Sequence, residues 1–280
     1  MRNLLNIEPP KGRPTFNIQR STLIGLVWLY IGLLILWPLT AVFRGAFAEG
    51  VGRFLQELSD PTLQRGFWLT LVLAAGAVAL NGIFGMIVAW VLVRHDFRGR
   101  AFLNGLVDLP FAISPVIAGY MLILLFGRQG WLGPLVKALD VRVVFALPGM
   151  LLVTIFVSLP FVIREVMPVL REIGTEAEQA AYTLGASPWQ TFWRVTLPGV
   201  RWGLAYGLAL TLARALGEFG AVLVVGGAIV GNTETTTLWI FRALEERQYL
   251  GAYAAAVVLG FLSFVILIGM ETWRRHSEVE

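Results

Sequence analysis

Residues 66–93 read GFWLTLVLAAGAVALNGIFGMIVAWVLV, a run of 28 residues without Lys, Arg, Asp or Glu. A helix of about 20 apolar residues, rising about 1.5 Å per residue, crosses the hydrocarbon core of a bilayer. Three other stretches of 21 to 23 residues also lack charge: 21–43, 143–163 and 248–270. Two more are interrupted only by Asp108 or by Arg214 and Glu218, namely 101–127 and 202–233. The pattern predicts an all-α polytopic membrane protein with six transmembrane helices.

The composition agrees with this fold class. Of the 280 residues, 57% are hydrophobic and 14% are charged, whereas about 25% are charged in an average soluble domain. This disfavours an ordinary soluble enzyme. The net charge of +4 would suggest nucleic acid as a partner of a soluble protein, but here the basic residues lie between spans and are interpreted as topology signals. No nucleic-acid partner is expected. The absence of cysteine excludes disulfides, thiolate zinc sites and iron–sulfur clusters.

Basic residues between the spans predict the orientation. With both termini in the cytoplasm, the inside segments carry 13 Lys and Arg and the outside segments carry 8, a mild bias in the sense of the positive-inside rule. We therefore expect a cytoplasmic N-terminal tail at 1–22, a first transmembrane helix at 23–43 and a cytoplasmic C-terminal tail at 272–280. The first apolar stretch is too long for a typical signal-peptide core and no clear cleavage site follows it, so we expect it to be retained.

The long segment between the fourth and fifth predicted spans, 164–201, predicts two short helices at the membrane surface. Thr175 to Glu178 fits a capping box that opens the first helix, and Gly185 is placed to end it. Ser187 to Gln190 fits a second capping box, and Pro198 is expected to stop the helix that follows. Three aromatic residues are expected at the lipid interface or the ends of the spans: Trp189, Phe192 and Trp193. Periodicity alone fits an amphipathic interfacial connector equally well.

Spacing within this segment resembles the EAA loop of the permease subunits of prokaryotic ABC importers, which reads Glu-Ala-Ala, three residues, Gly, nine residues, Ile-x-Leu-Pro. Val195 stands at the Ile position, and Gln179 replaces the usual Glu. Glu178 points about 100° away on a helix and is not an equivalent replacement. The resemblance implies a type I ABC importer permease fold over 66–271, with a cytoplasmic loop at 172–198 that docks on an ATPase. The implied ATPase-coupling residues are Gln179, Ala180, Ala181, Gly185, Leu197 and Pro198.

Three further stretches resemble the sulfate/thiosulfate permeases of that family, the W-type subunit most of all: 108–119, 148–157 and 214–222. The resemblance implies ATP-driven import of sulfate or thiosulfate across the bacterial cytoplasmic membrane. The implied partners are a second related permease subunit, two ATPase subunits that bind ATP and Mg, and an extracytoplasmic sulfate-binding protein. Molybdate permeases share the stretch from Gly217 to Gly220 but are usually shorter. A molybdate, tungstate or other oxyanion permease is therefore the alternative.

No residues for catalysis are recognisable in the sequence. A phosphate-binding loop of the form G-x-x-x-x-G-K-[ST] is absent, and His95 and His276 lie far apart without metal-ligand spacing. A serine nucleophile would find no histidine base within the spans. We therefore expect no catalytic site, metal or cofactor in this chain, with ATP hydrolysis left to partner subunits. An intramembrane enzyme and a secondary transporter working alone remain alternatives, which co-purification with an ATPase would separate from an importer subunit.

Arg214 and Glu218 are the most costly charged residues of the predicted spans, since a charge near a helix centre costs about 2.5–3.5 kcal/mol. Their i, i+4 spacing places them on one helical face, where they can pair. Two interpretations remain open. The pair fixes helix packing, or Arg214 supplies positive potential to an anion pathway while Glu218 orients it. Asp108 is interpreted as a helix-end or interfacial residue.

Small residues and prolines predict how the spans pack. Gly203 and Gly207 form a G-x-x-x-G pair that lets another helix approach closely. Together with the single EAA-like loop, this face implies a related permease as a mate. Kinks are expected in the third and fourth spans at Pro110, Pro115, Pro148 and Pro160.

Overall fold

Helices make up all the regular structure in residues 18–277, which the computed structural model describes. The first half contains α1 (Ile18–Ile31), the π-helical segment η1 (Gly32–Leu36), α2 (Trp37–Ala46), α3 (Gly50–Leu58), α4 (Pro61–Arg94), α5 (Arg100–Ala112), α6 (Pro115–Phe126) and α7 (Gly133–Ala138). The second half contains α8 (Leu147–Glu172), α9 (Glu176–Thr183), α10 (Pro188–Thr191), the π-helical segment η2 (Phe192–Thr196), α11 (Leu197–Leu216), α12 (Gly220–Gly226), α13 (Thr236–Glu245) and α14 (Tyr249–Ser277). The all-α prediction is confirmed. Most of the predicted tail 1–22, and residues 278–280 of the predicted tail 272–280, lie outside the described residues.

Four continuous stretches are long and apolar enough to cross a membrane: Ser21–Ala46, Pro61–Arg94, Leu147–Glu172 and Tyr249–Thr272. Two further candidates are helices joined at a sharp bend. α5 and α6 meet at 114°, and the run through α10 and α11 meets α12 at 59°. Counting each bent pair as one span gives six candidate spans among the described residues, at the places that the charge-free stretches predict. Two of the six are broken: the kink predicted at Pro115 is confirmed as the bend between α5 and α6, whereas the break in the fifth predicted span is not predicted.

Both breaks occur where the chain supplies residues that end a helix. Ser114 precedes Pro115, and a residue before proline is biased toward an extended conformation. Ser114 accordingly has φ −58° and ψ 138°. In the fifth predicted span α11 ends at Leu216, and Gly217 follows it at the C-cap. Two or three residues outside helical geometry, Ile113 and Ser114 at the first break and 217–219 at the second, are therefore enough to redirect an otherwise apolar segment.

The other prolines predicted to kink a span differ in their place in the helices. Pro110 lies inside α5 and Pro160 inside α8. Pro148 instead lies in the first turn of α8, where its missing N–H has no helical partner to lose and its fixed φ suits helix initiation. Pro148 therefore starts a helix and does not kink one.

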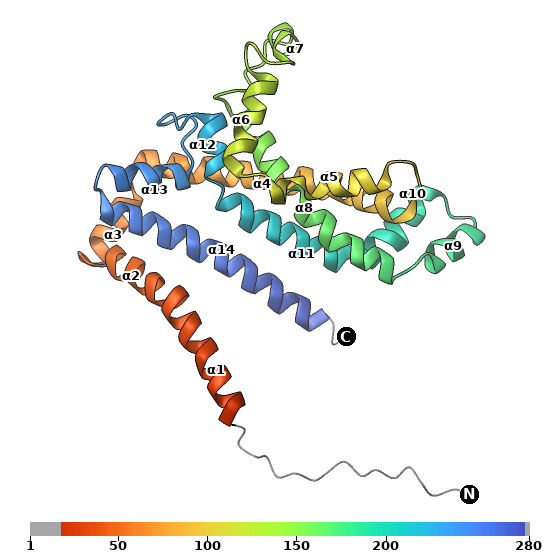
Figure 1. Cartoon of the computed structure of the whole chain (residues 1–280), viewed down its shortest axis with the longest axis horizontal. Helices are drawn as coiled ribbons and strands as arrows, with labels where there is room; N and C mark the ends of the chain where they lie inside the picture. The colour runs from red at the N-terminus through yellow and green to blue at the C-terminus, as the bar shows by residue number, and fades with distance from the viewer. Residues whose placement is uncertain (1–17, 278–280) are drawn as a thin grey trace, which may run out of the picture.

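Helices α4, α8 and α11 pack together as the centre of the bundle (Figure 1). A Cβ on Gly207 would lie 2.8 Å from Cα of Val162, and a Cβ on Gly203 would lie 2.9 Å from the carbonyl oxygen of Glu165. The close approach predicted for the Gly203/Gly207 face is confirmed. Its neighbour, however, is α8 of the same chain, so the face no longer argues for a permease mate.

The N-terminal helices extend away from this centre. α2 packs against α14, and Gly45 lies against the ring of Tyr253 so closely that a Cβ would come within 2.6 Å of it. Large apolar side chains farther toward the N-terminus, such as Trp28 and Tyr30, are exposed. Figure 1 shows α1 directed away from the bundle. Exposed apolar residues along the 26-residue candidate span Ser21–Ala46 suit contact with lipid.

Candidate functional site

The 172–198 loop folds into short helices at one end of the bundle (Figure 1). α9 ends at Thr183, and Gly185 lies just beyond its C-cap with a left-handed φ of +82°. The N–H of Gly185 donates to the carbonyl of Tyr182 and the N–H of Ala186 to that of Ala181, each at 3.0 Å. This is the Schellman pattern, in which the left-handed residue is usually glycine. The predicted place of Gly185 at the end of the first helix is confirmed.

α10 begins with the capping box that the sequence predicts. The Oγ of Ser187 accepts a hydrogen bond from the N–H of Gln190 at 3.3 Å, and Oε1 of Gln190 accepts one from the N–H of Ser187 at 2.9 Å. Pro188 lies in the first turn, where its fixed φ favours the helix. The two capping bonds satisfy backbone donors that would otherwise face the turn unpaired.

The capping box predicted at the start of α9 does not form. Thr175 makes no side-chain cap bond, and its Oγ1 accepts a hydrogen bond from the side-chain amide of Gln179 at 3.0 Å. The carboxylate that should complete the box, that of Glu178, is buried against other elements. A tertiary ion pair has replaced the local cap.

The helix that begins at Pro188 does not stop at Pro198, contrary to the prediction. It passes through η2 directly into α11. In η2 the N–H of Leu197 donates to the carbonyl of Phe192, five residues earlier, so the turn holds one residue more than an α-turn. Pro198 then falls in the first turn of α11. The π turn thus connects α10 to α11 without a break, and Pro198 lies just after it.

Glu178 and Arg94 form a buried ion pair that joins α9 to the end of α4. Their side chains are 12% and 8% exposed, and Nε of Arg94 lies 3.1 Å from Oε2 of Glu178. Arg94 also donates to the carbonyls of Leu170, at 2.9 Å, and Gly174, at 2.6 Å. The hydroxyl of Thr196 donates to Oε1 of Glu178 at 2.9 Å. These contacts, called the Arg94 cluster below, connect α4, α8, α9 and η2.

The sequence pattern does not predict the Arg94 cluster. Arg94 ends a charge-free stretch and is interpreted there as a topology signal. Glu178 is set aside because it is rotated about 100° from Gln179 on a helix. That rotation is itself the available signal, since Gln179 is exposed and Glu178 is the buried residue of α9.

The predicted coupling residues lie mainly on the outward side of the loop. Gln179, Ala180, Gly185 and Pro198 are exposed, while Ala181 and Leu197 are half-buried. Next to them three large apolar side chains face solvent: Leu184 is 88% exposed, Trp189 70% and Trp193 51%. The rings of Trp189 and Trp193 meet edge to face with centroids 5.6 Å apart, and Phe192 packs on the core beneath them. A cluster of exposed large apolar side chains suits contact with lipid or with another protein.

Arg214 and Glu218 are paired, but not on one helical face. α11 ends at Leu216, so Glu218 lies in the break before α12. Nη1 of Arg214 lies 2.6 Å from Oε2 of Glu218, whose side chain is 3% exposed against 29% for Arg214. Oε1 of Glu218 accepts the N–H of Ala221 at 2.9 Å, which helps to seat the start of α12. The geometry brings both residues together and holds Glu218 at the bend.

Asp108 lies within α5, where it meets Arg164 of α8. Nη2 of Arg164 lies 2.6 Å from Oδ2 of Asp108, and Nε donates to Oδ1 at 2.7 Å. Arg164 also donates to the side chain and the carbonyl of Asn104, at 2.9 and 3.0 Å. Asp108 precedes the last turn of α5 and is therefore not a helix-end residue, and its placement at the membrane interface stays a prediction. Its bidentate bond ties α5 to α8.

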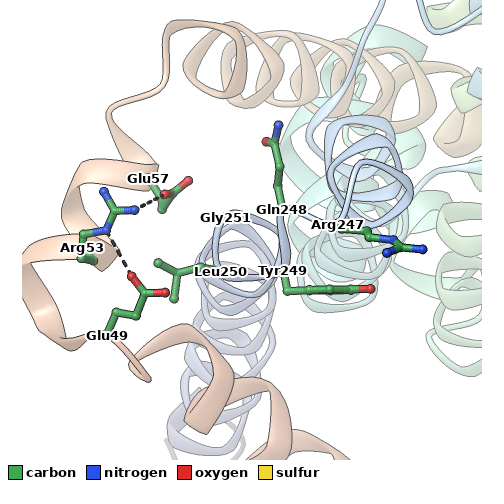
Figure 2. Close-up of a pocket in the computed structure, with 8 residues that line it drawn as sticks. All are labelled: Glu49, Arg53, Glu57, Arg247, Gln248, Tyr249, Leu250 and Gly251. Atoms are coloured by element: carbon green, nitrogen blue, oxygen red, sulfur yellow. Dashed lines mark hydrogen bonds and ion pairs between the residues drawn. The ribbon is translucent and has the colours of Figure 1, made fainter.

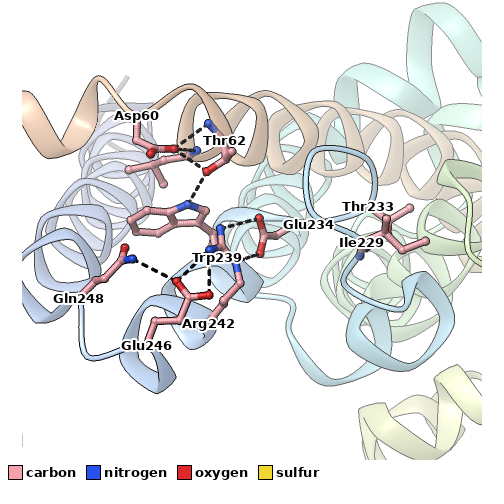
Figure 3. Close-up of polar contacts among 10 residues, drawn as sticks. Asp60, Thr62, Ile229, Thr233, Glu234, Trp239, Arg242, Glu246 and Gln248 are labelled. Atoms are coloured by element: carbon pink, nitrogen blue, oxygen red, sulfur yellow. Dashed lines mark hydrogen bonds and ion pairs between the residues drawn. The ribbon is translucent and has the colours of Figure 1, made fainter.

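At the opposite end of α4, Asp60 caps the helix (Figure 3). Its Oδ1 accepts the backbone N–H groups of Thr62 and Leu63, at 2.7 and 2.9 Å, and the hydroxyl of Thr62 at 2.5 Å. Burial alone would raise the pKa of Asp60, but these hydrogen bonds and the positive charge of Arg242 hold it below its ordinary value. The start of α4 is thus fixed by an ionised cap.

Arg242 of α13 lies near the Asp60 cap and forms ion pairs with two glutamates. It lies 2.6 Å from Glu234, whose side chain is 2% exposed, and 3.2 Å from Glu246. The hydrogen bond to Glu234 is the main reason why the pKa of Arg242 is raised. Nε1 of Trp239 donates to the hydroxyl of Thr62 at 2.9 Å and joins α13 to α4. This end of α4, with Asp60 and Arg242, is called the α13 end below.

A hollow of about 400 Å³ lies at the α13 end, between α3 and the start of α14 (Figure 2). Its lining includes the charged side chains of Glu49, Arg53, Glu57 and Arg247. Arg53 lies 3.3 Å from Glu49 and 4.0 Å from Glu57. Within the part of the chain that the structure describes, no three His, Asp or Glu residues are placed to hold a metal ion.

Comparison with known proteins identifies a family and several relatives of this chain. Residues 81–277 match the family described as the binding-protein-dependent transport system inner membrane component. The sulfate transport system permease protein CysW of Synechococcus elongatus is 52% identical over 246 residues, which cover 88% of this chain and 86% of that protein. The permease protein CysT of the same organism is 39% identical over 249 residues, covering 88% and 90%.

A solved structure supports the fold. The chain is similar to a chain of a bacterial alginate ABC transporter, crystallised in complex with an alginate pentasaccharide-bound periplasmic protein, with a TM-score of 0.76 at 19% identity. The likeness covers 95% of this chain and 98% of that one. The overall fold of this chain therefore occurs in a known transporter.

Proposed function

Since this chain belongs to the family of inner membrane components of binding-protein-dependent transport systems, we propose that it is the W-type permease subunit of an ATP-driven importer of sulfate or thiosulfate. The observation that carries the proposal is the 52% identity to a sulfate permease over 88% of the chain. As a member of this family, the chain is a multi-pass membrane transport subunit and not an enzyme. A molybdate or tungstate permease is the alternative that the same chemistry allows.

The proposed importer contains four kinds of subunit. This chain pairs with a second related permease, two ATPase subunits bind ATP and Mg, and an extracytoplasmic protein delivers the sulfate. The occurrence of both CysW and CysT in Synechococcus elongatus supports a pair of different permeases, because each is similar to this chain. In this proposal the chain itself holds no cofactor.

The proposed orientation places both termini and the 172–198 loop in the cytoplasm of a bacterium. Arg94, Arg98 and Arg100 lie close together at the loop end of α4, which agrees with the tendency of basic residues to remain inside. The α13 end then faces outward. Its exposed, charged hollow beside α3 is available to the binding protein.

The 172–198 loop is the proposed site of ATPase coupling. The bend at Gly185 fixes the angle between α9 and α10, and Gln179, Ala180, Ala181, Leu197 and Pro198 lie on or beside the face that the loop presents. Leu184 and Trp189 add exposed apolar surface to that face. A protein that covers this surface would remove it from water, and the associated free energy would hold the two subunits together.

The experiment that tests the proposal is purification of the importer through a tag on the ATPase, followed by uptake into vesicles. We expect this chain to co-purify and the vesicles to accumulate labelled sulfate only with ATP and the loaded binding protein. A complex with a hydrolysis-deficient ATPase is the matched control. Molybdate uptake well above sulfate uptake would favour the alternative, and transport by this chain alone would favour a secondary transporter.

A further inference from the structure

Two glycine turns isolate α9 from the backbone on either side of it. Gly174 precedes the helix with φ +63° and Gly185 follows it with φ +82°, and a Cβ added at either would meet no atom within 4 Å. The space beside both turns is therefore open. The main packing neighbours of α9 are α10 and η2. A force applied to α9 could therefore rotate it about these two turns unless side chains connect it to the long helices.

The Arg94 cluster supplies that connection. The guanidinium uses Nε, Nη1 and Nη2 at once, toward Glu178, the carbonyl of Leu170 and the carbonyl of Gly174. A planar guanidinium fixes the direction of several hydrogen bonds together, which a lysine ammonium cannot do. Because both charged side chains are largely buried, salt screens their attraction little. The bonds to Leu170 and Gly174 fix Arg94 against the end of α8, so for α9 to move apart from α4 and α8 the ion pair between Arg94 and Glu178 would have to break.

The π turn extends the connection to α11. Thr191, Thr196 and Val200 are all buried, although the first two are five residues apart and the last two are four apart. An α-helix turns about 100° per residue, so the extra residue in η2 keeps all three on one side. The hydroxyl of Thr196 thereby reaches Oε1 of Glu178 at 2.9 Å. Helix α11 is thus joined to the same carboxylate that holds α9 to α4.

We propose that Arg94 and Glu178 are positioning residues of ATPase coupling, which make α9 move as one body with the adjoining ends of α4, α8 and α11. The inference rests on the proposed function, because it needs an ATPase that displaces the loop. With the pair intact, closure of the ATPases moves the central helices of the bundle. Without it, the same closure bends the chain at Gly174 and Gly185, and ATP is hydrolysed with little transport.

The test is the double variant Arg94→Met with Glu178→Leu in the complete importer, reconstituted with ATPases, partner permease and binding protein. Removing both charges leaves neither one stranded, so folding and assembly are preserved better than in a single variant. The matched control is Asp96→Asn with Arg100→Gln, which removes an exposed ion pair just beyond the same end of α4. The readouts are the amount of assembled complex, basal ATP hydrolysis and sulfate uptake per ATP hydrolysed.

We expect the double variant to assemble and hydrolyse ATP at the basal rate, while uptake per ATP falls about tenfold, within the range found for residues that carry coupling between sites. The control should match the wild type. Wild-type uptake per ATP in the assembled double variant would overturn the inference, whether or not the amount of assembled complex is lower. If the double variant does not assemble, uptake per ATP is measured in Glu178→Gln instead. A reduced ratio would support the positioning role, and an unchanged ratio would overturn it. A wild-type chain that fails to co-purify with an ATPase would instead refute the proposed function.

Discussion

The bend at Gly185 allows a graded perturbation of the loop, because its geometry depends on one backbone torsion. Replacing Gly185 by Asn, Ala or Val adds a Cβ to a residue at φ +82°. Since no atom lies within 4 Å of that Cβ, no clash with neighbouring side chains contributes. The series therefore varies the free energy of the left-handed conformation and little else in the isolated subunit.

The magnitude follows from that conformation. A left-handed residue with a Cβ costs roughly 1–2 kcal/mol, a β-branched residue costs more, and Asn tolerates the region best. Because about 1.4 kcal/mol changes an equilibrium constant tenfold, Gly185→Val should lower the equilibrium constant for the observed bend about tenfold or more. Gly185→Asn should lower it least, and Gly185→Ala should fall between them.

The assay compares sulfate uptake with ATP hydrolysis in vesicles that contain the assembled importer. We expect insertion and hydrolysis to persist in all variants, while uptake per ATP falls in the order Gly, Asn, Ala, Val. Gly105→Ala is the matched control, because Gly105 lies in α5 without a positive φ and with open space around its Cβ. It should transport like the wild type.

Two results would refute this reasoning. Wild-type uptake by Gly185→Val would mean that the bend is not needed for coupling. Equal losses for Asn and Val would mean that the added side chain obstructs the bound ATPase, so that the contact surface and not the torsion is the sensitive feature.

Further changes test other parts of the chain. Arg214→Met should strand the carboxylate of Glu218 and lower the yield of assembled complex, since breaking a buried pair costs about 3–5 kcal/mol. The double change with Glu218→Leu should restore the yield, and its uptake per assembled complex separates a packing role, with near wild-type uptake, from a pathway role, with low uptake. Asp60→Ala should reduce thermal stability at neutral pH by about 0.5–2 kcal/mol through loss of the N-cap. Because the pKa of this carboxyl is lowered by folding, its contribution is lost as pH falls below the ordinary value of 3.8, so the difference between the two proteins should shrink there. Gly119→Ala should lower the melting temperature, as its Cβ would lie 2.6 Å from a carbonyl oxygen of α12. Gln179→Glu should leave assembly intact, and a large loss in a pull-down would show that the ATPase contacts this residue differently.

The sequence predicts where apolar segments lie better than how they run. Each of the six predicted segments overlaps a candidate span or a bent pair, because length and lack of charge are local properties. Length and lack of charge do not show the bends at Ser114 and Gly217, although Pro115 predicts a kink beside the first. Two or three non-helical residues redirect a helix without changing its hydropathy. The packing that stabilises the new direction, such as α12 against α6, involves residues about 100 positions apart.

The same distinction applies to the candidate site. Gly185 and the capping box at Ser187 are predicted because a turn and a cap depend on residues within one or two helical turns. The fate of Glu178 depends on Arg94, 84 residues away. The capping-box pattern assigns the carboxylate of Glu178 to the start of α9. In the folded chain this carboxylate instead pairs with the buried guanidinium of Arg94 and accepts a hydrogen bond from Thr196. Long-range pairing of this kind requires the packed bundle to be known first.

The length of α4 restricts how this protein can change through insertion and deletion. The helix has 34 residues and is therefore about 50 Å long, well beyond the roughly 30 Å of a hydrocarbon core. Both of its ends are fixed, by the Asp60 cap and by Arg94. One residue gained or lost between them would rotate one end about 100° relative to the other and remove one set of contacts. Substitutions along α4 are therefore expected to be tolerated far more often than changes in its length, and length variation should collect in connections such as 127–146.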